Sequence, residues 1–431
     1  MDTMLPPQGQ TESKTGIDID GRRGHSTCRF CGGELHPLVD LGLSPLCESF
    51  VPENQVNDGE SFYPLNVKIC SSCWLAQLGE YVAPDHIFGE YAYFSSFSEA
   101  WLAHTKKYID DMAARFGLGA ESFIMEVASN DGYLLRHAVE RGIPCLGIEP
   151  AANVALAAEK VGVKTLVRFF GVELAKELAA EGKQADLIAG NNVLAQVPDL
   201  NDFVGGFPIA LKPQGVLTLE FPHLLRLIEQ NQFDTIYHEH FSYFSLGAVE
   251  RILAAHGMRV FDVQELWTHG GSLRIFGCRA EASHAEAPAV AALRAREIAF
   301  GLEDLQTYAA FDRHVRDTKH KLLALLIELK RAGKKIVGYG APGKGNTLLN
   351  YCGIRTDFLD FTVDRNPYKH GRYLPGTRIP VLAPAALKHA RPDCVLILPW
   401  NLKDEIMQQL AFIRDWGGRF IVPIPEATLI D

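Results

Sequence analysis

The 431-residue sequence has no run of 18 or more apolar residues, which is about the length that a membrane-spanning helix requires. Positive charge is also scarce, since 42 Lys and Arg residues stand against 52 Asp and Glu residues and leave a net charge of −10. Nucleic-acid-binding proteins usually carry a basic surface. Neither a membrane nor a nucleic acid is therefore expected as a partner.

An apolar signal sequence is missing as well. Residues 1–24 are polar and contain Gly and Pro, so we expect them to form a disordered leader. The remaining chain is long enough for two or three domains with a sizeable core. These properties favour a cytoplasmic protein, either a monomer or a small homo-oligomer.

Cysteine is uncommon, with nine residues, but four of them form a pattern. Cys28 and Cys31 make one CxxC, and Cys70 and Cys73 make a second after 38 intervening residues. Four thiolates at this spacing suit one tetrahedral zinc ion and leave no ligand position open, so the metal would be structural. The alternatives are unrelated CxxC turns or disulfides. The zinc interpretation predicts a small, separate N-terminal module that needs its metal to fold.

The middle third of the chain alternates between helical and strand patterns. A helix is predicted over residues 101–116, followed by the apolar segment SFIMEV, a polar turn, a helix over residues 134–141 and a second strand that ends at Glu149. The segments ADLIAGNNVLAQVPD and KPQGVLTLEFP continue the alternation with further strands. This order predicts a doubly wound α/β domain.

The turn after the first of these strands is a candidate nucleotide-binding loop. Glu126, Ala128, Asn130 and Gly132 have the spacing of an acidic-x-Gly-x-Gly-x-Gly loop, and Glu149 ends the next strand, where a carboxylate can accept both ribose hydroxyls. NAD and S-adenosylmethionine both fit such a loop. Pyrophosphate binding prefers true glycines, two of which are replaced here, so the pattern favours S-adenosylmethionine.

A dense group of polar and aromatic residues, YHEHFSYFS, follows the segment LLRLIEQNQF. His, Glu and Tyr can each transfer or orient a proton, which makes the segment a candidate for acid–base catalysis. The alternative is a hydrogen-bonded polar core. Its expected place after the fifth strand of the sheet, near the ligand crevice, favours catalysis.

The last third predicts a second Rossmann-like domain. A long amphipathic helix is expected from about Glu297 to Ala332, followed by KKIVGYGAPGKGNTLLNY as strand, Gly-rich turn and helix. The turn imitates a P-loop, but Gly345 replaces the Ser or Thr that holds magnesium, so an NTPase is not expected. Backbone amides, Lys344 and Asn346 could hold a diphosphate; a tight strand-to-helix turn is the alternative.

Taken together, these motifs resemble the three-domain sugar C-methyltransferases. The resemblance covers about residues 26–430 and rests on the CxxC pairs and on EYAYFSSFS, EVASNDG, NNVLAQVPD, IYHEHFSYFS and VGYGAPGKGNT. It implies methylation of a nucleotide-linked 4-keto-deoxysugar at C3, through an enolate that a base generates next to the ketone. The substrate partner would be this nucleotide sugar, and the cofactors S-adenosylmethionine and structural zinc.

The resemblance also assigns roles to residues. It implies that His240 is the base, that Tyr237 and Glu239 lie beside it, and that Tyr93 lies close to the sugar. Gln196 departs from the family pattern, in which many members carry a His, and an amide cannot carry a proton near neutral pH. The full set of expected sites is, for catalysis, His240, Glu239, Tyr237 and Tyr93; for the cofactor, Glu126, Ser129, Asn130, Gly132, Glu149 and Asn192; for the substrate, Gln196, Gly343, Lys344 and Asn346; and for the metal, Cys28, Cys31, Cys70 and Cys73.

We therefore expect an α/β protein with a zinc-binding module, a central class I methyltransferase domain and a C-terminal Rossmann-like domain. The expected boundaries are a leader at 1–24, the zinc module at 25–85, the methyltransferase domain at 86–285, bridging helices at 286–332 and the last domain at 333–431. Two other functions stay open, namely an O- or N-methyltransferase on a related metabolite and a non-catalytic zinc-scaffolded binding protein.

Overall fold

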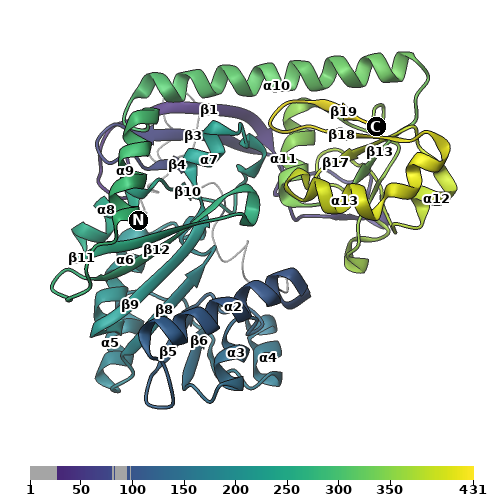
Figure 1. Ribbon diagram of the computed structural model, residues 1–431. Helices are drawn as coiled ribbons and strands as arrows, with labels where there is room; N and C mark the ends of the chain where they lie inside the picture. The colour runs from purple at the N-terminus through teal and green to yellow at the C-terminus, as the bar shows by residue number, and fades with distance from the viewer. Residues whose placement is uncertain (1–26, 80–81, 83–94, 98) are drawn as a thin grey trace, which may run out of the picture.

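The structure is a computed structural model that describes residues 27–79, 82, 95–97 and 99–431. It contains the three expected parts: a small N-terminal sheet, a central mixed sheet and a C-terminal α/β domain, with the long helix α10 (Leu305–Arg331) running across the first and last of them (Figure 1). The expected role of Tyr93 lies outside the described residues. Among the described helices, none combines the length and the apolar composition that crossing a bilayer would need.

The N-terminal sheet has the order β1-β3-β4-β10. Its strands are β1 (Leu35–Ser44), β3 (Tyr63–Cys70), β4 (Ala76–Leu78) and β10 (Ser242–Tyr243). The first three come from the zinc module, but β10 follows the YHEH segment and pairs antiparallel with β4 through Ser242 and Tyr243. The zinc module thus holds one end of the histidine segment by backbone pairing.

The zinc module does not stand apart as a self-contained unit, in contrast to the expectation. Buried residues of β1 and β3, such as Leu41 and Val67, belong to one hydrophobic cluster with Leu322 of α10 and Leu348 of the C-terminal domain. Figure 1 shows α10 lying along β1. Apolar packing against other parts of the chain therefore adds to whatever the metal contributes to the stability of the module.

The central sheet has the strand order β11-β12-β9-β8-β5-β6-β7. The strands are β5 (Ile124–Val127), β6 (Cys145–Ile148), β7 (Thr165–Leu166), β8 (Ala185–Asn191), β9 (Leu211–Pro222), β11 (Met258–Leu266) and β12 (Ser272–Arg279). β5 to β9 pair in parallel, and β12 joins β9 antiparallel. All residues of β5 are buried, as a parallel strand covered on both faces requires.

Helices cover both faces of this sheet (Figure 1). They are α2 (Glu99–Phe116), α3 (Leu135–Glu140), α4 (Ala152–Lys160), α5 (Val172–Ala180), α6 (Leu200–Ala210) and α8 (Leu246–Ala255). Helix α7 (Leu224–Glu229) instead packs with the N-terminal sheet, in the hydrophobic cluster that contains β1 and β3 (Figure 1). The helices predicted at 101–116 and 134–141 correspond to α2 and α3. The central domain is thus the doubly wound, Rossmann-like fold that the sequence predicts.

The C-terminal domain is likewise an α/β unit, built around a sheet with the strand order β16-β14-β13-β17-β18-β19. Its elements are β13 (Ile336–Tyr339), α11 (Gly343–Cys352), β14 (Thr362–Val363), β16 (Val381–Leu382), α12 (Ala386–Ala390), β17 (Cys394–Ile397), α13 (Lys403–Gln409), β18 (Arg419–Val422) and β19 (Thr428–Ile430). The switch in strand order falls at β13, and ligands of such sheets bind beyond the carboxyl ends of the strands at this point. The Gly-rich turn at 340–345 lies there.

The single bridging helix predicted from Glu297 to Ala332 is wrong. The structure has two helices, α9 (Pro288–Phe300) and α10, separated at Gly301. Gly301 adopts φ 93°, which ends α9 in the left-handed region that glycine tolerates, and the Asp304 side chain accepts from the Gln306 amide to begin α10. One helix was predicted because the amphipathic pattern continues on both sides of the break, and these two capping signals were not recognised within it.

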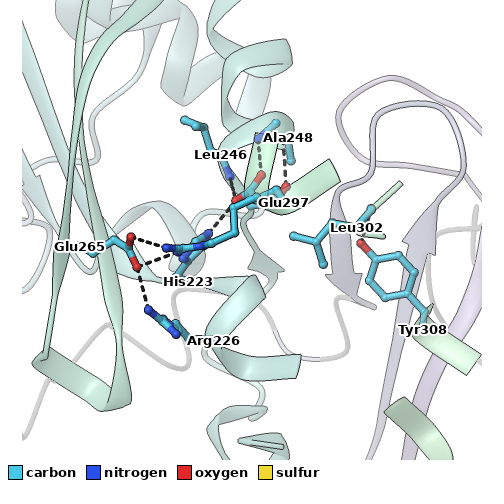
Figure 2. Close-up of polar contacts among 11 residues, drawn as sticks. His223, Arg226, Leu246, Ala248, Glu265, Glu297, Leu302 and Tyr308 are labelled. Carbon is cyan, nitrogen blue, oxygen red and sulfur yellow. Dashed lines mark hydrogen bonds and ion pairs between the residues drawn. The ribbon is translucent and has the colours of Figure 1, made fainter. Parts of the chain in front are cut away.

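Helix α9 is tied to the central domain by a buried carboxylate (Figure 2). Glu297 Oε1 lies 2.6 Å from His223 Nε2, and the carboxylate accepts from the amides of Leu246 and Gly247 at 2.7 and 3.0 Å. His223 precedes α7 and the two amides begin α8. Glu297 therefore fixes the two helices that flank the histidine segment in the sequence.

Candidate active site

The four expected zinc ligands converge. The Sγ atoms of Cys28, Cys31, Cys70 and Cys73 all lie within 4.8 Å of one another, with Cys28–Cys73 at 3.6 Å and Cys31–Cys70 at 3.5 Å. These separations are too long for disulfides, but they are close to the roughly 3.8 Å that Zn–S bonds of about 2.3 Å give in a tetrahedron. The donor set fits one zinc ion, and its four positions leave none for a substrate.

The loop after β5 keeps the backbone of a glycine-rich nucleotide loop although two glycines are replaced. Ala128, Asn130 and Gly132 have φ of 59°, 46° and 75°. Left-handed backbone costs an Ala roughly 1–2 kcal/mol, so its presence in this loop marks a conformation that the surrounding structure imposes. The sequence motif therefore corresponds to real loop geometry at all three glycine positions.

Glu149 lies at the carboxyl end of β6, as expected for a ribose-binding acid. Its carboxylate is 6% exposed and accepts from the amides of Asn130 and Ala151, both at 2.9 Å. Burial raises the pKa of Glu149, while these two hydrogen bonds oppose the shift. The residue thus joins the loop after β5 to the start of α4.

Several polar atoms beside this loop have no hydrogen-bond partner within the described residues. They are buried oxygens of Ser129, Asp131 and Asn192. Unpaired buried polar atoms are costly, and a polar ligand can satisfy them. Ser129 is the exception, because its side chain faces Gly147, where even a Cβ would lie 2.4 Å from Ser129 Oγ. The backbone of Ser129 is also engaged, since its amide donates to Ile148 O and its carbonyl accepts from the Gly132 amide.

The segment that precedes α2 also reaches this loop. The Ser95 amide donates to Asn130 Oδ1 at 3.0 Å, and the Ser96 amide donates to Asp131 Oδ2 at 3.1 Å. These serines belong to the EYAYFSSFS motif. Ser95 and Ser96 therefore lie next to the cofactor loop, although each stands 35 residues from its partner in the sequence.

The histidine segment, residues 234–243, is contacted by all three parts of the chain. Its Phe241 amide donates to Ala195 O of the central domain at 2.7 Å, and Phe241 O accepts from the Leu78 amide of the zinc module at 2.9 Å. From the C-terminal domain, Thr347 Oγ1 donates to Ile236 O at 2.9 Å. Gln196 directly follows Ala195, so the expected substrate residue lies next to this segment.

His240 is held as a neutral imidazole. The residue is 7% exposed, its ring centroid lies 4.2 Å from that of Tyr237, and it hydrogen-bonds to the backbone of Thr235. The pKa of His240 is lowered to about 3, mainly by burial and to a smaller extent by His269 and Lys344, while the hydrogen bond to the Thr235 backbone opposes the shift. A neutral ring nitrogen can accept a proton, which is the first requirement of the base assigned here.

Glu239 faces the opposite way, toward the zinc module. Cys47 Sγ lies 3.5 Å from Glu239 Oε1, and Glu48 pairs with Lys369 at 3.3 Å in the same cluster. Burial and the charge of Glu48 raise the pKa of Glu239 to about 7, against the lowering effects of Cys47 and Lys369. Adjacent residues of the YHEH motif thus have pKa values displaced in opposite directions.

The Gly-rich turn brings the remaining expected substrate residues to the same boundary. Lys344 Nζ donates to Asn401 Oδ1 at 2.9 Å and lies 4.8 Å from the centre of the Trp400 ring. Asn346 donates to Cys47 O, so its amide group connects two domains and leaves only its buried, unpartnered Oδ1 for a ligand. Gly343 begins α11, where a Cβ would lie 2.9 Å from Cys47 Sγ. Lys344 is the member of this set with a charged side chain.

Three residues at this boundary were not predicted. Asp234 is fully buried and accepts from Trp400 Nε1 at 2.7 Å, and burial raises its pKa to about 6. His269 lies in the connection between β11 and β12. The signal for His269 was the string WTHGGS, in which two glycines follow a His between two strand patterns. For Asp234 and Trp400 the sequence holds no comparable signal, since their contact joins positions 166 residues apart.

Comparisons with known proteins agree with this arrangement. Three family models match in order: a zinc binding domain at residues 28–88, a methyltransferase domain at 101–263 and a C-methyltransferase C-terminal domain at 267–425. The C-methyltransferase NovU of Streptomyces niveus is 37% identical over 404 residues, which cover 94% of this chain and 96% of the relative.

Two solved structures share parts of the fold. The magnesium protoporphyrin IX methyltransferase of Synechocystis PCC 6803 is 14% identical, with a TM-score of 0.34 over 41% of this chain and 83% of its own. The glycopeptide N-methyltransferase MtfA is 13% identical, with a TM-score of 0.33 over 41% of this chain and 96% of its own.

The strand order of the central sheet, the loop after β5 and the matching domain model define an S-adenosylmethionine-dependent methyltransferase. Its cofactors are S-adenosylmethionine and a structural zinc ion. The full-length relationship to NovU places the chain more narrowly: it belongs to the C-methyltransferase family, with a zinc-binding, a methyltransferase and a C-terminal domain.

Proposed function

We propose that the protein methylates C3 of a nucleotide-linked 4-keto-deoxysugar, with His240 as the base that generates the enolate. The observation that carries this proposal is the neutral His240 at the domain boundary, with the cofactor domain on one side and Lys344 of the C-terminal Gly-rich turn close enough to lower its pKa. A carbon can act as nucleophile only after a proton is removed next to a carbonyl group, which is what such a base provides.

The steps balance as follows. A ring nitrogen of His240 takes the C3 proton, the C–H electron pair forms a C=C bond, and the carbonyl π electrons move to the C4 oxygen. The enolate carbon then attacks the sulfonium methyl group of S-adenosylmethionine, and the S–CH₃ electron pair returns to sulfur as the thioether. The imidazolium loses its proton to water afterwards.

The C-terminal domain supplies a fitting site for the nucleotide diphosphate. The turn after β13 leads into the N-terminus of α11, where free backbone amides favour an anion, and Lys344 adds a positive charge. Burial lowers the pKa of Lys344 while Asp234 raises it. The other groups proposed to contact substrate are Tyr237, Glu239, Gln196, Gly343 and Asn346, and those proposed to contact the cofactor are Glu126, Ser129, Asn130, Gly132, Glu149 and Asn192.

A panel experiment tests the proposal. Purified protein is incubated with methyl-labelled S-adenosylmethionine and with pairs of nucleotide sugars that differ only in a 4-keto or a 4-hydroxyl group. Label should enter the keto member of a pair and not the reduced member. Equal labelling of both members would favour an O-methyltransferase, since an oxygen nucleophile needs no ketone, and would overturn the enolate.

A further inference from the structure

His269 lies in a turn that the structure anchors on two sides. On one side, Thr268 Oγ1 donates to Glu220 Oε1 at 3.1 Å, and Glu220 is fully buried and paired with Arg274 at 2.9 Å. On the other side, Gly270 packs so closely on the C-terminal domain that a Cβ would lie 2.8 Å from Trp400 Cη2. The turn is thus fixed between the central and C-terminal domains.

Between these anchors, His269 is exposed and has a left-handed backbone with φ 55° and ψ 16°. Left-handed backbone is uncommon for residues other than Gly, although His, Asn and Asp adopt it more often than the rest, and it clusters at functional sites. The Trp101 ring, from α2, lies edge-on at 5.8 Å from the His269 ring. The imidazole is therefore presented at the boundary and not packed into a core.

His269 lies near residues that take part in the proposed reaction. Gly270, which follows His269, packs on Trp400, and Trp400 Nε1 donates to Asp234 of the histidine segment at 2.7 Å. The turn therefore lies next to the segment that carries His240. The pKa of His269 is lowered to about 4, mainly because the surrounding protein reduces the hydration of its ring; Lys344 and His104 lower it less, and Glu220 opposes the shift. His269 is consequently neutral at pH 7, with one ring N–H available as a donor.

We propose that His269 is a second catalytic residue, which donates a hydrogen bond from its neutral ring to the C4 oxygen of the enolate while His240 removes the C3 proton. This inference rests on the proposed function. The proton stays on the His269 nitrogen throughout, and the hydrogen bond strengthens as negative charge moves onto the oxygen. Neutral imidazoles are effective in this role because they match the oxygen without a costly charge of their own.

Other groups at the boundary serve this purpose less well. Lys344 Nζ is directed to Asn401 and the Trp400 ring, on the C-terminal domain. Gln196 has an amide donor, but it follows Ala195, which contacts the segment at Phe241, whereas the turn of His269 is anchored beside Trp400 and Asp234. Asp234 is fully buried against Trp400. Among these groups, His269 is the one that combines an exposed side chain, a neutral ring and a fixed backbone.

The test compares His269→Asn and His269→Gly with the wild type. Both replacements tolerate the left-handed backbone, so the turn should persist. The Gly variant has no donor, and its kcat for the keto sugar should fall about 10²-fold, the usual effect of losing one oxyanion donor. The Asn variant has a shorter donor and should fall between the Gly variant and the wild type. His320→Asn, on the exposed surface of α10, is the matched control and should keep the wild-type kcat.

Binding measurements distinguish a catalytic role of His269 from a structural one. Dissociation constants for S-adenosylhomocysteine and for the nucleotide sugar should stay within about threefold in both variants, because the donor acts on the transition state. A loss of kcat matched by an equal loss of binding would assign His269 a structural role and overturn the inference. Wild-type turnover by His269→Gly would also overturn it while leaving the proposed function standing. Failure of the wild type to methylate any keto sugar would instead overturn the proposed function.

Discussion

Two neighbouring residues, Glu239 and His240, compete for the role of base, and their environments separate them. Burial is the main cause that lowers the pKa of His240 to about 3, whereas burial together with the charge of Glu48 raises the pKa of Glu239 to about 7. A depressed pKa keeps His240 unprotonated down to acidic pH. A raised pKa keeps Glu239 protonated below neutral pH.

The pH dependence of kcat/KM distinguishes the two, because it reports the ionisations of the free enzyme. With His240 as the base, kcat/KM should show no fall as the pH decreases from about 8 to about 6, since the imidazole is neutral throughout this range. A fall centred near pH 7, together with a severe loss of kcat in Glu239→Gln, would move the base to Glu239. Initial rates across this pH range, at subsaturating keto sugar, are the measurement.

Glu149 gives a second prediction at the residue scale. A carboxylate that accepts charge-assisted hydrogen bonds from a ribose contributes roughly 1.5–3 kcal/mol, so Glu149→Gln should weaken S-adenosylmethionine binding about 10- to 100-fold. Calorimetric titration measures this. The Asn130 and Ala151 amides donate to different oxygens of Glu149, and Gln keeps only one of these acceptors. The melting temperature of the variant is therefore measured as well, to separate a lost ribose contact from a disturbed loop. Unchanged affinity would show that the ribose lies elsewhere.

At the scale of elements, the bridge between the zinc module and β10 links a metal site to a distant catalytic segment. Cys70 ends β3, which pairs with β4, and β4 pairs with β10 directly after the YHEH residues. Loss of the metal should therefore loosen the segment that carries His240.

This connection predicts that Cys70→Ser lowers the zinc content from about one ion per chain, lowers the melting temperature and raises KM for the sugar. Cys145→Ser, a half-buried cysteine outside the cluster, is the control and should change none of the three. Elemental analysis, thermal unfolding and initial rates make the comparison. A zinc-free protein with wild-type stability and KM would contradict the structural role of the metal.

The carboxylate of Glu297 is a further link between elements. A buried donor that loses its acceptor costs roughly 1–3 kcal/mol, so Glu297→Ala, which leaves His223 and the α8 amides without their acceptor, should lower the melting temperature markedly. Glu286→Ala removes an exposed carboxylate near the start of the same helix and should have little effect. Equal melting temperatures for the two variants would contradict this account.

At the scale of the whole molecule, the sequence predicts what depends on local pattern and misses what depends on long-range contact. The parallel strands are found because their apolar runs are buried on both faces, and the cofactor loop because three left-handed positions follow a recognisable spacing. The pairing of β10 with β4 and the shared core of α10 were missed, because two-residue strands and lateral helix packing leave no periodic signal. For the same reason His269, far from the YHEH segment in sequence, needed the structure.

Each of the three parts of the chain has a different role in the proposed reaction. The central domain holds the methyl donor, the C-terminal domain presents Lys344 and the N-terminus of α11, and the zinc module secures the segment between them through β10. Each part contributes a hydrogen bond to the histidine segment. Catalysis at this boundary therefore needs all three in place.

The central claim, methyl transfer to the carbon next to a ketone, is tested most directly by NMR of the product formed with ¹³C-methyl S-adenosylmethionine. We predict that a nucleotide-linked 4-keto-deoxysugar acquires the labelled methyl on C3, and that His240→Asn, with both ligands still bound, forms this product about 10²- to 10⁴-fold more slowly. A labelled methyl on oxygen or nitrogen, or a wild-type rate in His240→Asn, would contradict the account.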